Sequence, residues 1–428
     1  MKYYSTRDKS ARYSLREAAF LGLAPDGGLF MPETVPQADM QRVAALAGEP
    51  FARTARYVAG LFFRDDLSDE QLDAIVEDAY GFDIPLRHLG DDRYTLELFH
   101  GPTFAFKDVG AGFMGRALGQ LNRGGEDLVI LTATSGDTGS AVANGFYGVE
   151  GVKVVVLYPQ GKVSDLQESQ MTTLGGNIYP LRVRGTFDDC QRIVKEIFSD
   201  ADFRRRKRVT SANSINVLRW MPQAFYYFYA WAQWLSATGE SRPDIVVPSG
   251  NYGNLAAGML AARMGMPVGR FIAASNANDV IPAYLRTGEF SPRTSVMTLA
   301  NAMDVGNPSN YERMMDLYGG DFAALSARVK GFRCDDADIL RAIDEIYRRY
   351  GYVSDPHSAI GYAAACAYGV RGFWLSTAHR AKFSQVIRRA LGQDFPLPQG
   401  LEKFLGRQKR FTSVDPDAAA VEDFVAGL

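Results

Sequence analysis

Two segments of the chain repeat one order of apolar and polar positions. Each begins with a short apolar run, passes through a Ser-Gly-x-x-Gly loop into a helix of small residues, and ends in a second apolar run. The three parts are 128–131, 140–146 and 152–157 in the first segment, and 245–247, 255–263 and 271–274 in the second. Short apolar runs on either side of a helix are typical of βαβ units, so the pattern predicts two of them.

Other stretches predict the elements around these units. Residues 1 to about 90 contain amphipathic stretches such as 69–79, which indicate a separate N-terminal helical layer. A strand is expected over 178–183, followed by a helix over 187–198. The stretch 220–235 is rich in aromatic residues and predicts a helix buried between two lobes.

The composition is that of a globular protein. Of 428 residues, 46% are hydrophobic and 22% are charged, and 47 basic against 49 acidic residues give a net charge of −2. This balance argues against a surface dedicated to nucleic acid or to an anionic membrane. The basic run at 204–208 is expected to be a solvated turn between a helix and a strand.

Cysteine usage and hydropathy narrow the protein class further. The three cysteines, Cys190, Cys334 and Cys366, are too widely spaced to indicate a disulfide framework or a zinc site, and the four histidines indicate no metal either. No apolar run reaches the roughly 18 residues that a membrane helix needs. We therefore expect a cytoplasmic protein with no metal, no membrane partner and no nucleic-acid partner.

One lysine has an unusual setting. Lys107 lies in the run His-Gly-Pro-Thr-Phe-Ala-Phe-Lys-Asp-Val at 100–109, among two phenylalanines, an alanine and a proline. Such surroundings disfavour the charged ammonium and lower its pKa, and a neutral amine can form a Schiff base with a carbonyl, including that of pyridoxal phosphate. A lone Lys-Asp pair is more often an ordinary surface lysine, so Lys107 alone does not decide the chemistry.

The two glycine-rich loops add a second kind of chemistry. Glycines let the backbone turn sharply and bring N–H groups close to a ligand, and the N-terminus of the following helix adds partial positive charge. A single loop of this kind is weak evidence for an anion site, because glycine is common at such turns for packing reasons. Two matched loops together with a desolvated lysine suit a phosphorylated aldehyde and an amino-acid carboxylate.

Five motifs stand out along the chain: HGPTFAFKD at 100–108, TSGDTG at 134–139, SANSIN at 211–216, SGNYGN at 249–254 and DPHSA at 355–359. Together they resemble the threonine synthase family, a group of fold-type II pyridoxal phosphate enzymes, in its bacterial and fungal branch. Shorter matches at 26–32, 157–163 and 174–177 extend the resemblance, which runs from about residue 13 to about residue 380.

The resemblance implies an α/β fold of the tryptophan synthase β-like type, with two three-layer α/β lobes and an N-terminal helical subdomain. The subdomain would span 1–94, the first lobe 95–240 and the second lobe 241–428. Because the chain crosses between lobes in this fold, the lobes are expected to be discontinuous. The sequence does not decide the oligomeric state, so a monomer and a homodimer both stay open.

The resemblance also implies the cofactor site. Lys107 would hold pyridoxal phosphate as a Schiff base and act as the base that takes the α-proton. Asp137 would lie next to the ring hydroxyl, where a proton or a water must separate the two oxygens. Ser358 would hydrogen-bond the pyridine nitrogen, with His357 beside it as a structural residue. The cofactor phosphate would lie in the loop formed by Ser249, Gly250, Asn251, Tyr252, Gly253 and Asn254.

Substrate recognition follows from the same motifs. The α-carboxylate of the substrate would bind at Ser135, Thr138 and Gly139, and Thr103 would line the substrate site. A second phosphate would bind at Asn213, Ser214 and Arg219, two neutral donors and a guanidinium. From the residues alone, an N-cap serine and a surface arginine explain this last set as well.

The implied reaction converts O-phospho-L-homoserine and water to L-threonine and phosphate, by loss of phosphate from Cγ and addition of water at Cβ. A phospholyase of the same fold would release 2-oxobutyrate and ammonia instead, and a non-catalytic relative would keep the fold as a binding module. The intact Lys107 argues against the binding module. The segment 301–309 also resembles the family but has no evident chemistry.

Overall fold

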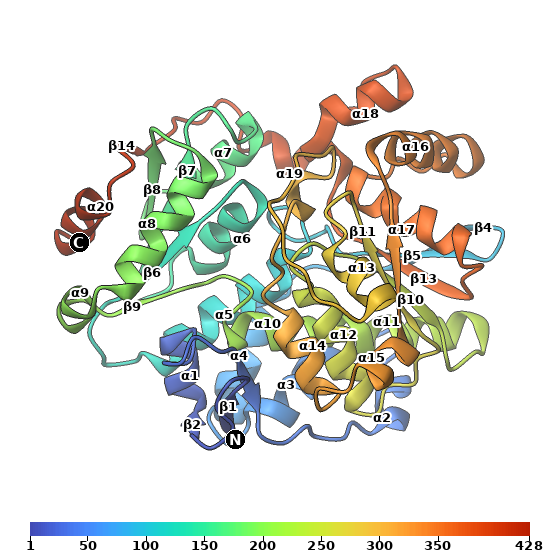
Figure 1. The fold of residues 1–428 in the computed structure, drawn as a ribbon, viewed down its shortest axis with the longest axis horizontal. Helices are drawn as coiled ribbons and strands as arrows, with labels where there is room; N and C mark the ends of the chain where they lie inside the picture. Colours follow the sequence, from blue (N-terminus) through green and yellow to red (C-terminus); the bar gives the residue numbers. More distant parts are fainter.

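The computed structural model describes all residues, 1–428, and consists of two α/β lobes above an N-terminal subdomain (Figure 1). The first lobe has a five-stranded parallel sheet in the order β14-β8-β7-β6-β9. Its strands are β6 (Leu128–Ala133), β7 (Val152–Pro159), β8 (Ile178–Val183), β9 (Val209–Thr210) and β14 (Thr412–Val414). The expected strands at 128–131, 152–157 and 178–183 are confirmed.

Helices cover both faces of this sheet, because its strands are apolar on both sides. Val155 and Leu157 pack with the outer helix α8, whereas Val154 and Val156 belong to the core shared with α6. The helices of the lobe are α6 (Asp137–Phe146), α7 (Asp165–Thr172), α8 (Phe187–Ser199), α9 (Ala201–Arg206) and α20 (Ala418–Ala426). The lobe therefore has the three layers that the resemblance implies.

The second lobe has a six-stranded sheet in the order β12-β11-β10-β13-β5-β4, parallel except for the β4–β5 pair. Its strands are β4 (Leu86–Gly90), β5 (Arg93–Glu97), β10 (Asp244–Pro248), β11 (Phe271–Ser275), β12 (Val329–Arg333) and β13 (Gly372–Ser376). Alternate strand residues face two separate cores: Val246 and Ile272 pack in one, Ile245 and Val247 in the other. This lobe also has three layers.

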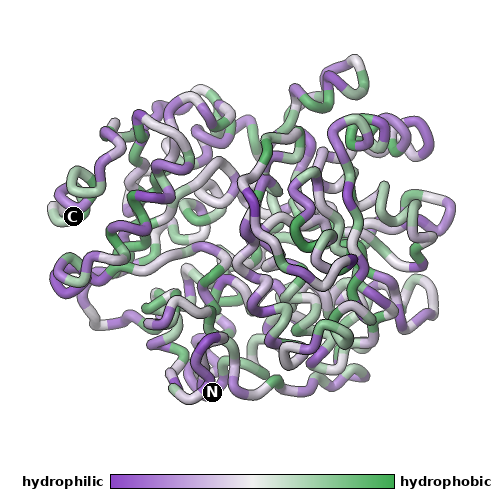
Figure 2. Tube along the Cα trace, viewed as in Figure 1, coloured by the Kyte–Doolittle hydropathy of each residue, from purple (hydrophilic) through white to green (hydrophobic).

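Two groups of helices cover this second sheet. On one face lie α16 (Asp336–Tyr350), α17 (Pro356–Ala367) and α18 (Ser384–Leu391), whose buried residues join the smaller core. The second group packs on the larger core and consists of α11 (Ala224–Thr238), α12 (Gly253–Arg263), α13 (Val280–Thr287), α14 (Tyr311–Leu317) and α15 (Phe322–Arg328). The lobe also contains the short helix α19 (Gln399–Glu402) and the 3₁₀ turns η2 (Asn301–Met303) and η3 (Arg380–Phe383). Figure 2 shows polar residues along the outer surface of α16 and α18.

The N-terminal subdomain is only partly helical, which corrects the expectation of a helical layer. A three-stranded antiparallel sheet, β2-β1-β3, accompanies its helices. The strands have four residues or fewer, too short for their alternation to be visible in the sequence. The elements are β1 (Lys2–Ser5), β2 (Tyr13–Ser14), α1 (Leu15–Leu21), β3 (Phe30–Pro32), α2 (Met40–Ala45), α3 (Phe51–Phe63) and α4 (Asp69–Ala79).

Two further local predictions are corrected. The stretch 220–235 is buried as expected, but it is not one helix: α10 (Val217–Trp220), the 3₁₀ turn η1 (Met221–Gln223) and α11 follow one another, because Pro222 lacks the N–H that a continuous helix needs. Arg204, Arg205 and Arg206 form the last turn of α9, capped at its start by Asp200, so the basic run is mostly helical and not a turn.

The lobes are discontinuous in sequence, as expected, but the expected ranges do not each contain one sheet. β14 and α20 fall within 241–428 and yet lie on the sheet of the first lobe, and β4 falls within 1–94 and yet lies on the sheet of the second. Pairing between β14 and β8 joins residues more than 200 positions apart, which local patterns cannot predict. Figure 1 shows the C-terminal helix α20 at the far edge of the first lobe.

Helix α5 (Lys107–Leu121) lies at the base of both lobes and carries Lys107 as its first residue. Glycines allow α5 to approach α6 closely: a Cβ at Gly115 would lie 2.2 Å from the carbonyl oxygen of Gly145. This contact packs the last turn of α6 against the middle of α5. None of the helices combines the length and the apolar character that crossing a membrane requires.

Candidate active site

Lys107 is surrounded by charged groups from both lobes: Asp137 on α6, Arg219 on α10 and Lys382 on η3. Its side chain is half-buried. Burial lowers the pKa of the Lys107 amine to about 8, an effect that Asp137 opposes and that Arg219 and Lys382 reinforce. No carboxylate pairs with the Lys107 amine, so the expected desolvated amine is present.

The loop after β10 presents a row of free donors. The backbone N–H groups of Gly250, Asn251, Tyr252, Gly253 and Asn254 have no acceptor within the protein. They stand at the N-terminus of α12, an 11-residue helix, so the helix dipole adds to their attraction for an anion. Since polar backbone groups in such a position require a partner, this loop fits a phosphate.

Glycine is required at one position of this loop. A Cβ at Gly250 would lie 2.6 Å from the Met303 Cα, whereas a Cβ at Gly253 would come no closer than 3.3 Å, to Ser214. Tyr252 adopts a left-handed conformation with φ 59°, and its hydroxyl bonds to Ser275 in the core. The Tyr252 side chain therefore points away from the loop, and only its backbone can serve an anion.

The two asparagine side chains of the loop are engaged within the protein. Asn254 donates to the Pro248 carbonyl at 2.9 Å and accepts from the Ser249 hydroxyl. Asn251 donates to the Ser214 hydroxyl at 2.7 Å. These side chains fix the shape of the loop, and the neighbouring N–H groups are left for the ligand.

The segment 301–309, which had no evident chemistry, covers this loop. Met303 packs on Gly250, and the N–H of Ser309 donates to the Asn251 side-chain oxygen at 2.7 Å. Asn310, one residue further, donates to the Asn251 carbonyl at 3.0 Å. The segment therefore packs against the loop at 249–254, called the phosphate loop below, and helps to fix its conformation.

The loop between β6 and α6 is built around the Thr134 hydroxyl. This oxygen accepts from the N–H of Gly136 at 2.9 Å and from that of Gly139 at 2.8 Å. The Gly139 N–H is thus taken, which corrects its expected role as a carboxylate donor. The N–H groups of Ser135 and Thr138 have no acceptor within the protein, and both residues are accessible. They remain free for a carboxylate at the start of α6.

Asp137 forms an ion pair that the sequence did not predict. The Lys382 ammonium lies 2.7 Å from Asp137 Oδ1, and the Gln167 side chain donates to the same oxygen at 2.9 Å. Burial alone would raise the pKa of Asp137, but Lys382 and Lys107 hold it far below its usual value. Asp137 is therefore ionised, and its charge is compensated by Lys382.

The predicted second phosphate site has free donors. Arg219 is buried, and its only bond is to the Ala212 carbonyl; no carboxylate pairs with it. Asn213 accepts from Thr132 at 2.9 Å, so its side-chain N–H₂ group is free, and Ser214 accepts from Asn251, so its O–H is free. The alternative of an N-cap serine and a surface arginine is wrong, because Asn216 caps α10.

The charge and burial of the Arg219 guanidinium suit the binding of an anion. Burial lowers the pKa of its guanidinium to about 10, with Asp108 as the opposing charge. A buried cation without a carboxylate partner is costly unless an anion joins it. A bound phosphate would supply that anion.

Thr103, expected to line the substrate site, has its polar groups engaged within the protein. Its hydroxyl and N–H both donate to the Asp108 carboxylate, and its carbonyl accepts from Lys382 at 2.8 Å. Burial raises the pKa of Asp108 to about 6, although these bonds lower it in part. Thr103 is therefore a buried structural residue that fixes the loop before α5.

The region around Ser358 is a closed network. The Ser358 hydroxyl donates to Asp355 and accepts from the Thr377 N–H at 2.9 Å. His357 Nε2 accepts from the Ala302 N–H at 3.2 Å and its Nδ1 pairs with Asp355 at 2.8 Å, so His357 is the structural residue expected. The Ser358 proton is committed to Asp355, whereas the neighbouring Thr377 hydroxyl has no partner.

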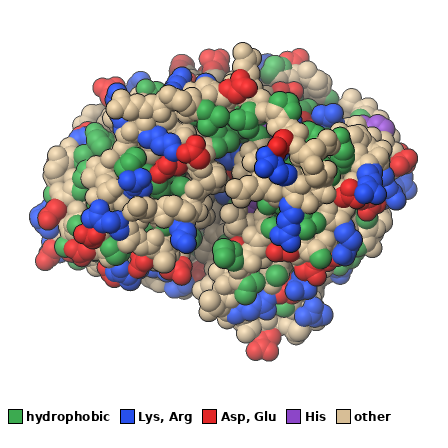
Figure 3. Space-filling view, turned by 90° about the horizontal axis from the view of Figure 1, so that it is seen from above, with side chains coloured by type: hydrophobic (Ala, Val, Ile, Leu, Met, Phe, Trp, Pro, Cys, Tyr) green, Lys and Arg blue, Asp and Glu red, His purple; other side chains and the backbone are tan.

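Sequence reasoning missed Lys382 and Thr377. Lys382 stands between Ala381 and Phe383, so the criterion that selected Lys107 applies to it too. Thr377 follows the carboxyl end of β13, where parallel sheets place ligand-contacting residues. Figure 3 shows the surface hollowed between the two halves of the molecule.

These residues fit pyridoxal phosphate. The group needs an amine with a lowered pKa, a cradle of N–H donors for its phosphate and polar partners for its ring. Lys107, the free N–H groups of 250–254 and the Asp137 carboxylate supply them. The close approach of Met303 to Gly250 is consistent with a cradle shaped for a small anion.

Comparison with known families agrees with this site. A family model described as pyridoxal-phosphate dependent enzyme matches residues 85–372. Models described as threonine synthase N terminus and as threonine synthase, C-terminal match residues 2–80 and 358–425. Together they cover nearly the whole chain.

Individual relatives match over similar lengths. A threonine synthase of Haemophilus influenzae is 42% identical over 410 residues, covering 94% of each chain, and that of Escherichia coli K12 is 40% identical over 406 residues, again 94% of each. The crystal structure of the Escherichia coli threonine synthase superposes with a TM-score of 0.91 at 39% identity, over 100% of both chains. A pyridoxal-phosphate-bound threonine synthase from Brucella melitensis gives a TM-score of 0.94 at 34% identity, over 100% of this chain and 99% of that one. The chain therefore belongs to the threonine synthase family of fold-type II pyridoxal phosphate enzymes.

Proposed function

We propose that this enzyme acts on O-phospho-L-homoserine and that Arg219, Asn213 and Ser214 bind the phosphate of that substrate. The observation that carries the proposal is the buried Arg219 guanidinium, which has no carboxylate partner and stands beside two side chains with free donors. A charge-assisted contact of this kind suits a phosphate dianion. The second donor row, at 250–254, is left for the cofactor phosphate.

The two phosphate sites are separate but joined. Asn251 belongs to the cofactor-phosphate loop, and its side chain donates to Ser214 in the substrate segment at 2.7 Å. A phosphorylated amino acid and the cofactor would therefore bind side by side, with Lys107 near Arg219 of the substrate segment. The N–H groups of Ser135 and Thr138 would receive the α-carboxylate, as the sequence suggests, without Gly139.

Lys107 carries the proton transfers in this proposal. At neutral pH and above, a pKa of about 8 leaves a useful fraction of its Nζ unprotonated, so the amine can take a proton from Cα of the substrate and return it later. Bound pyridoxal phosphate would supply the electron sink for the carbanion chemistry. Asp137, held in place by Lys382 and Gln167, would face the ring hydroxyl, and Ser358 or Thr377 would face the ring nitrogen.

The overall bond changes balance as follows. Protons leave Cα and Cβ, the Cγ–O bond breaks and phosphate departs with its bridging oxygen. Water then adds its hydroxyl at Cβ and its other proton goes to the departed phosphate, while protons return to Cα and Cγ, which gives threonine. Arg219, Asn213 and Ser214 hold the phosphate while the Cγ–O bond breaks, where they stabilise the charge of the leaving group.

A phospholyase would use the same residues up to the loss of phosphate. Assaying phosphate, threonine and 2-oxobutyrate in one reaction separates the two activities. We expect one threonine for each phosphate, with 2-oxobutyrate as a minor product. Equal amounts of phosphate and 2-oxobutyrate would identify a phospholyase, and the absence of phosphate release would indicate the non-catalytic binding module.

We also propose a cytoplasmic location, on the evidence of three free cysteines.

A further inference from the structure

Two lysines, one half-buried and one fully buried, act on one carboxylate in this site. Lys107 on α5 and Lys382 on η3 both act electrostatically on Asp137, but only Lys382 forms an ion pair with it, at 2.7 Å. The Lys382 side chain is fully buried and also donates to the Thr103 carbonyl at 2.8 Å. Lys107 is left without a carboxylate partner.

The contacts of Asp137 show how this arrangement is fixed. Oδ1 of Asp137 receives both Lys382 and the Gln167 amide, and Oδ2 has no donor within the protein. Lys382 reaches Asp137 from the opposite lobe, so the pair also spans the boundary between the lobes. The ion pair therefore holds one oxygen of Asp137 and leaves the other for a ligand.

We propose that Lys382 is a positioning residue of the active site: by pairing with Asp137 it keeps that carboxylate from capturing Lys107, and so keeps Lys107 a free amine. The proposal rests on the role of Lys107 as the reactive amine. Without Lys382, Asp137 would be an uncompensated buried carboxylate beside Lys107, and proton uptake by Lys107 would relieve it.

All charged groups near Lys107 enter this balance. Asp137 favours the protonated form of Lys107, whereas Lys382 and Arg219 disfavour that form. Asp108, the next residue on α5, is directed to Thr103 instead. Burial sets the overall direction, so in the wild type we expect the free amine to predominate above pH of about 8. Loss of Lys382 removes one of the two cations and should move this midpoint upward.

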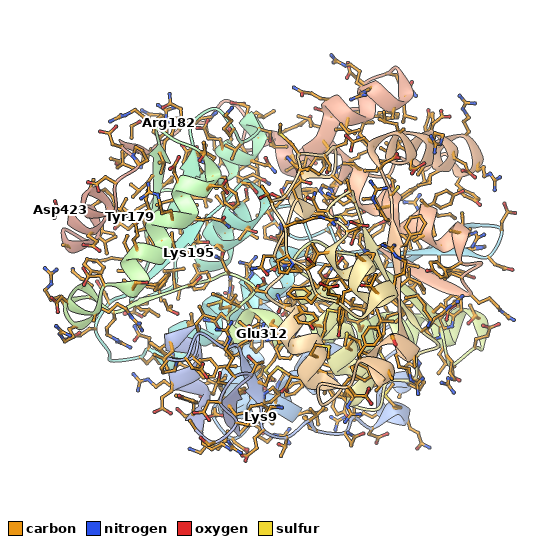
Figure 4. All side chains as sticks on the ribbon, viewed as in Figure 1. Lys9, Tyr179, Arg182, Lys195, Glu312 and Asp423 are labelled. Carbon is orange, nitrogen blue, oxygen red and sulfur yellow. The ribbon has the colours of Figure 1, made fainter.

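The test measures the pH dependence of Lys107 acylation by acetic anhydride in the full-length protein without cofactor, with modified lysines identified by mass spectrometry. Lys195, exposed on α8, is the internal reference (Figure 4). We expect a midpoint of about 8 for Lys107 in the wild type. In Lys382→Met the midpoint should rise by about one to three pH units, the usual effect of an unshared opposite charge.

Two further variants separate charge from structure. Lys382→Arg keeps the cation and should restore a midpoint close to that of the wild type. In the double variant Asp137→Asn/Lys382→Met the competing carboxylate is gone, so its midpoint should return toward about 8. If Lys382→Met alone does not fold, Lys382→Gln, which keeps a polar group beside Asp137, takes its place and should show the same rise.

An unchanged midpoint in Lys382→Met, or in Lys382→Gln where that variant replaces it, would overturn the proposal. So would an equal rise when Lys382→Met is added to Asp137→Asn, because Lys382 would then act on Lys107 without Asp137. In the holoenzyme, the pH titration of the visible absorbance gives a second reading, and it should shift upward in Lys382→Met and back in the double variant. Labelling without cofactor involves no substrate. A wrong assignment of substrate or product would therefore leave the labelling result intact.

Discussion

The side-chain amide of Asn251 donates a 2.7 Å hydrogen bond to the hydroxyl of Ser214. Asn251 lies in the loop that the structure equips for the cofactor phosphate, and Ser214 lies in the segment proposed for the substrate phosphate. One hydrogen bond thus connects two proposed anion sites on different lobes. The N–H of Ser309 donates to the side-chain oxygen of the same asparagine. Filling one site should therefore help to order the other.

This coupling predicts a non-additive pair of variants. Ser214→Ala and Asn251→Ala should each lower kcat/KM for O-phospho-L-homoserine, and the double variant should lose less than the product of the two effects. Contacting residues typically show coupling of about 0.5 to 3 kcal/mol, which corresponds to a factor of roughly 2 to 150. Steady-state kinetics at saturating pyridoxal phosphate measure the cycle. Strictly multiplicative effects would show that the hydrogen bond does not link the sites.

Arg219 should serve the substrate and not the cofactor. In Arg219→Met the cation is lost while much of the buried stem remains, so we expect cofactor content and the visible spectrum to stay unchanged. Loss of a charge-assisted contact costs about 1.5 to 3 kcal/mol, or roughly a ten- to hundredfold fall in kcat/KM. Arg205→Met, on the exposed last turn of α9, is the matched control. Loss of cofactor in Arg219→Met, or full activity, would speak against this assignment.

The glycines of the phosphate loop differ in what they tolerate. A methyl group at Gly250 would meet the Met303 backbone at 2.6 Å, whereas one at Gly253 comes no closer than 3.3 Å to Ser214. Overpacking costs about 1 to 3 kcal/mol, so Gly250→Ala should weaken pyridoxal phosphate binding roughly 5- to 150-fold and Gly253→Ala much less. Spectral titration of cofactor-free protein gives both dissociation constants. Equal affinities in the two variants would mean that Met303 does not shape the loop.

The elements that carry the chemistry were predictable because their signals are local. The strands before Thr134 and Ser249, the glycine loops after them and the lysine among phenylalanines can each be recognised within about ten residues. The short N-terminal strands and the pairing of β14 with β8 were not predictable, since the former show no periodicity and the latter depends on distant parts of the chain.

The same distinction applies within the site. The backbone N–H groups at 250–254 are unpaired, and their role toward a cofactor phosphate stays a prediction. The roles of individual side chains depend on partners far away in sequence. Thr103 is committed to Asp108, Gly139 to Thr134, and Asn251 to Ser214 and Ser309. The pair of Lys382 with Asp137 joins residues 245 positions apart, and only the folded chain brings them together.

Oxygen-isotope labelling during turnover of O-phospho-L-homoserine tests the central claim most directly. The reaction is run in water enriched in oxygen-18, and threonine and phosphate are analysed by mass spectrometry. If Lys107 and the Arg219 site perform loss of phosphate from Cγ followed by addition of water at Cβ, threonine gains one heavy oxygen at its hydroxyl and phosphate gains none. Heavy oxygen in phosphate, with homoserine as the organic product, would show hydrolysis of the P–O bond and contradict the account.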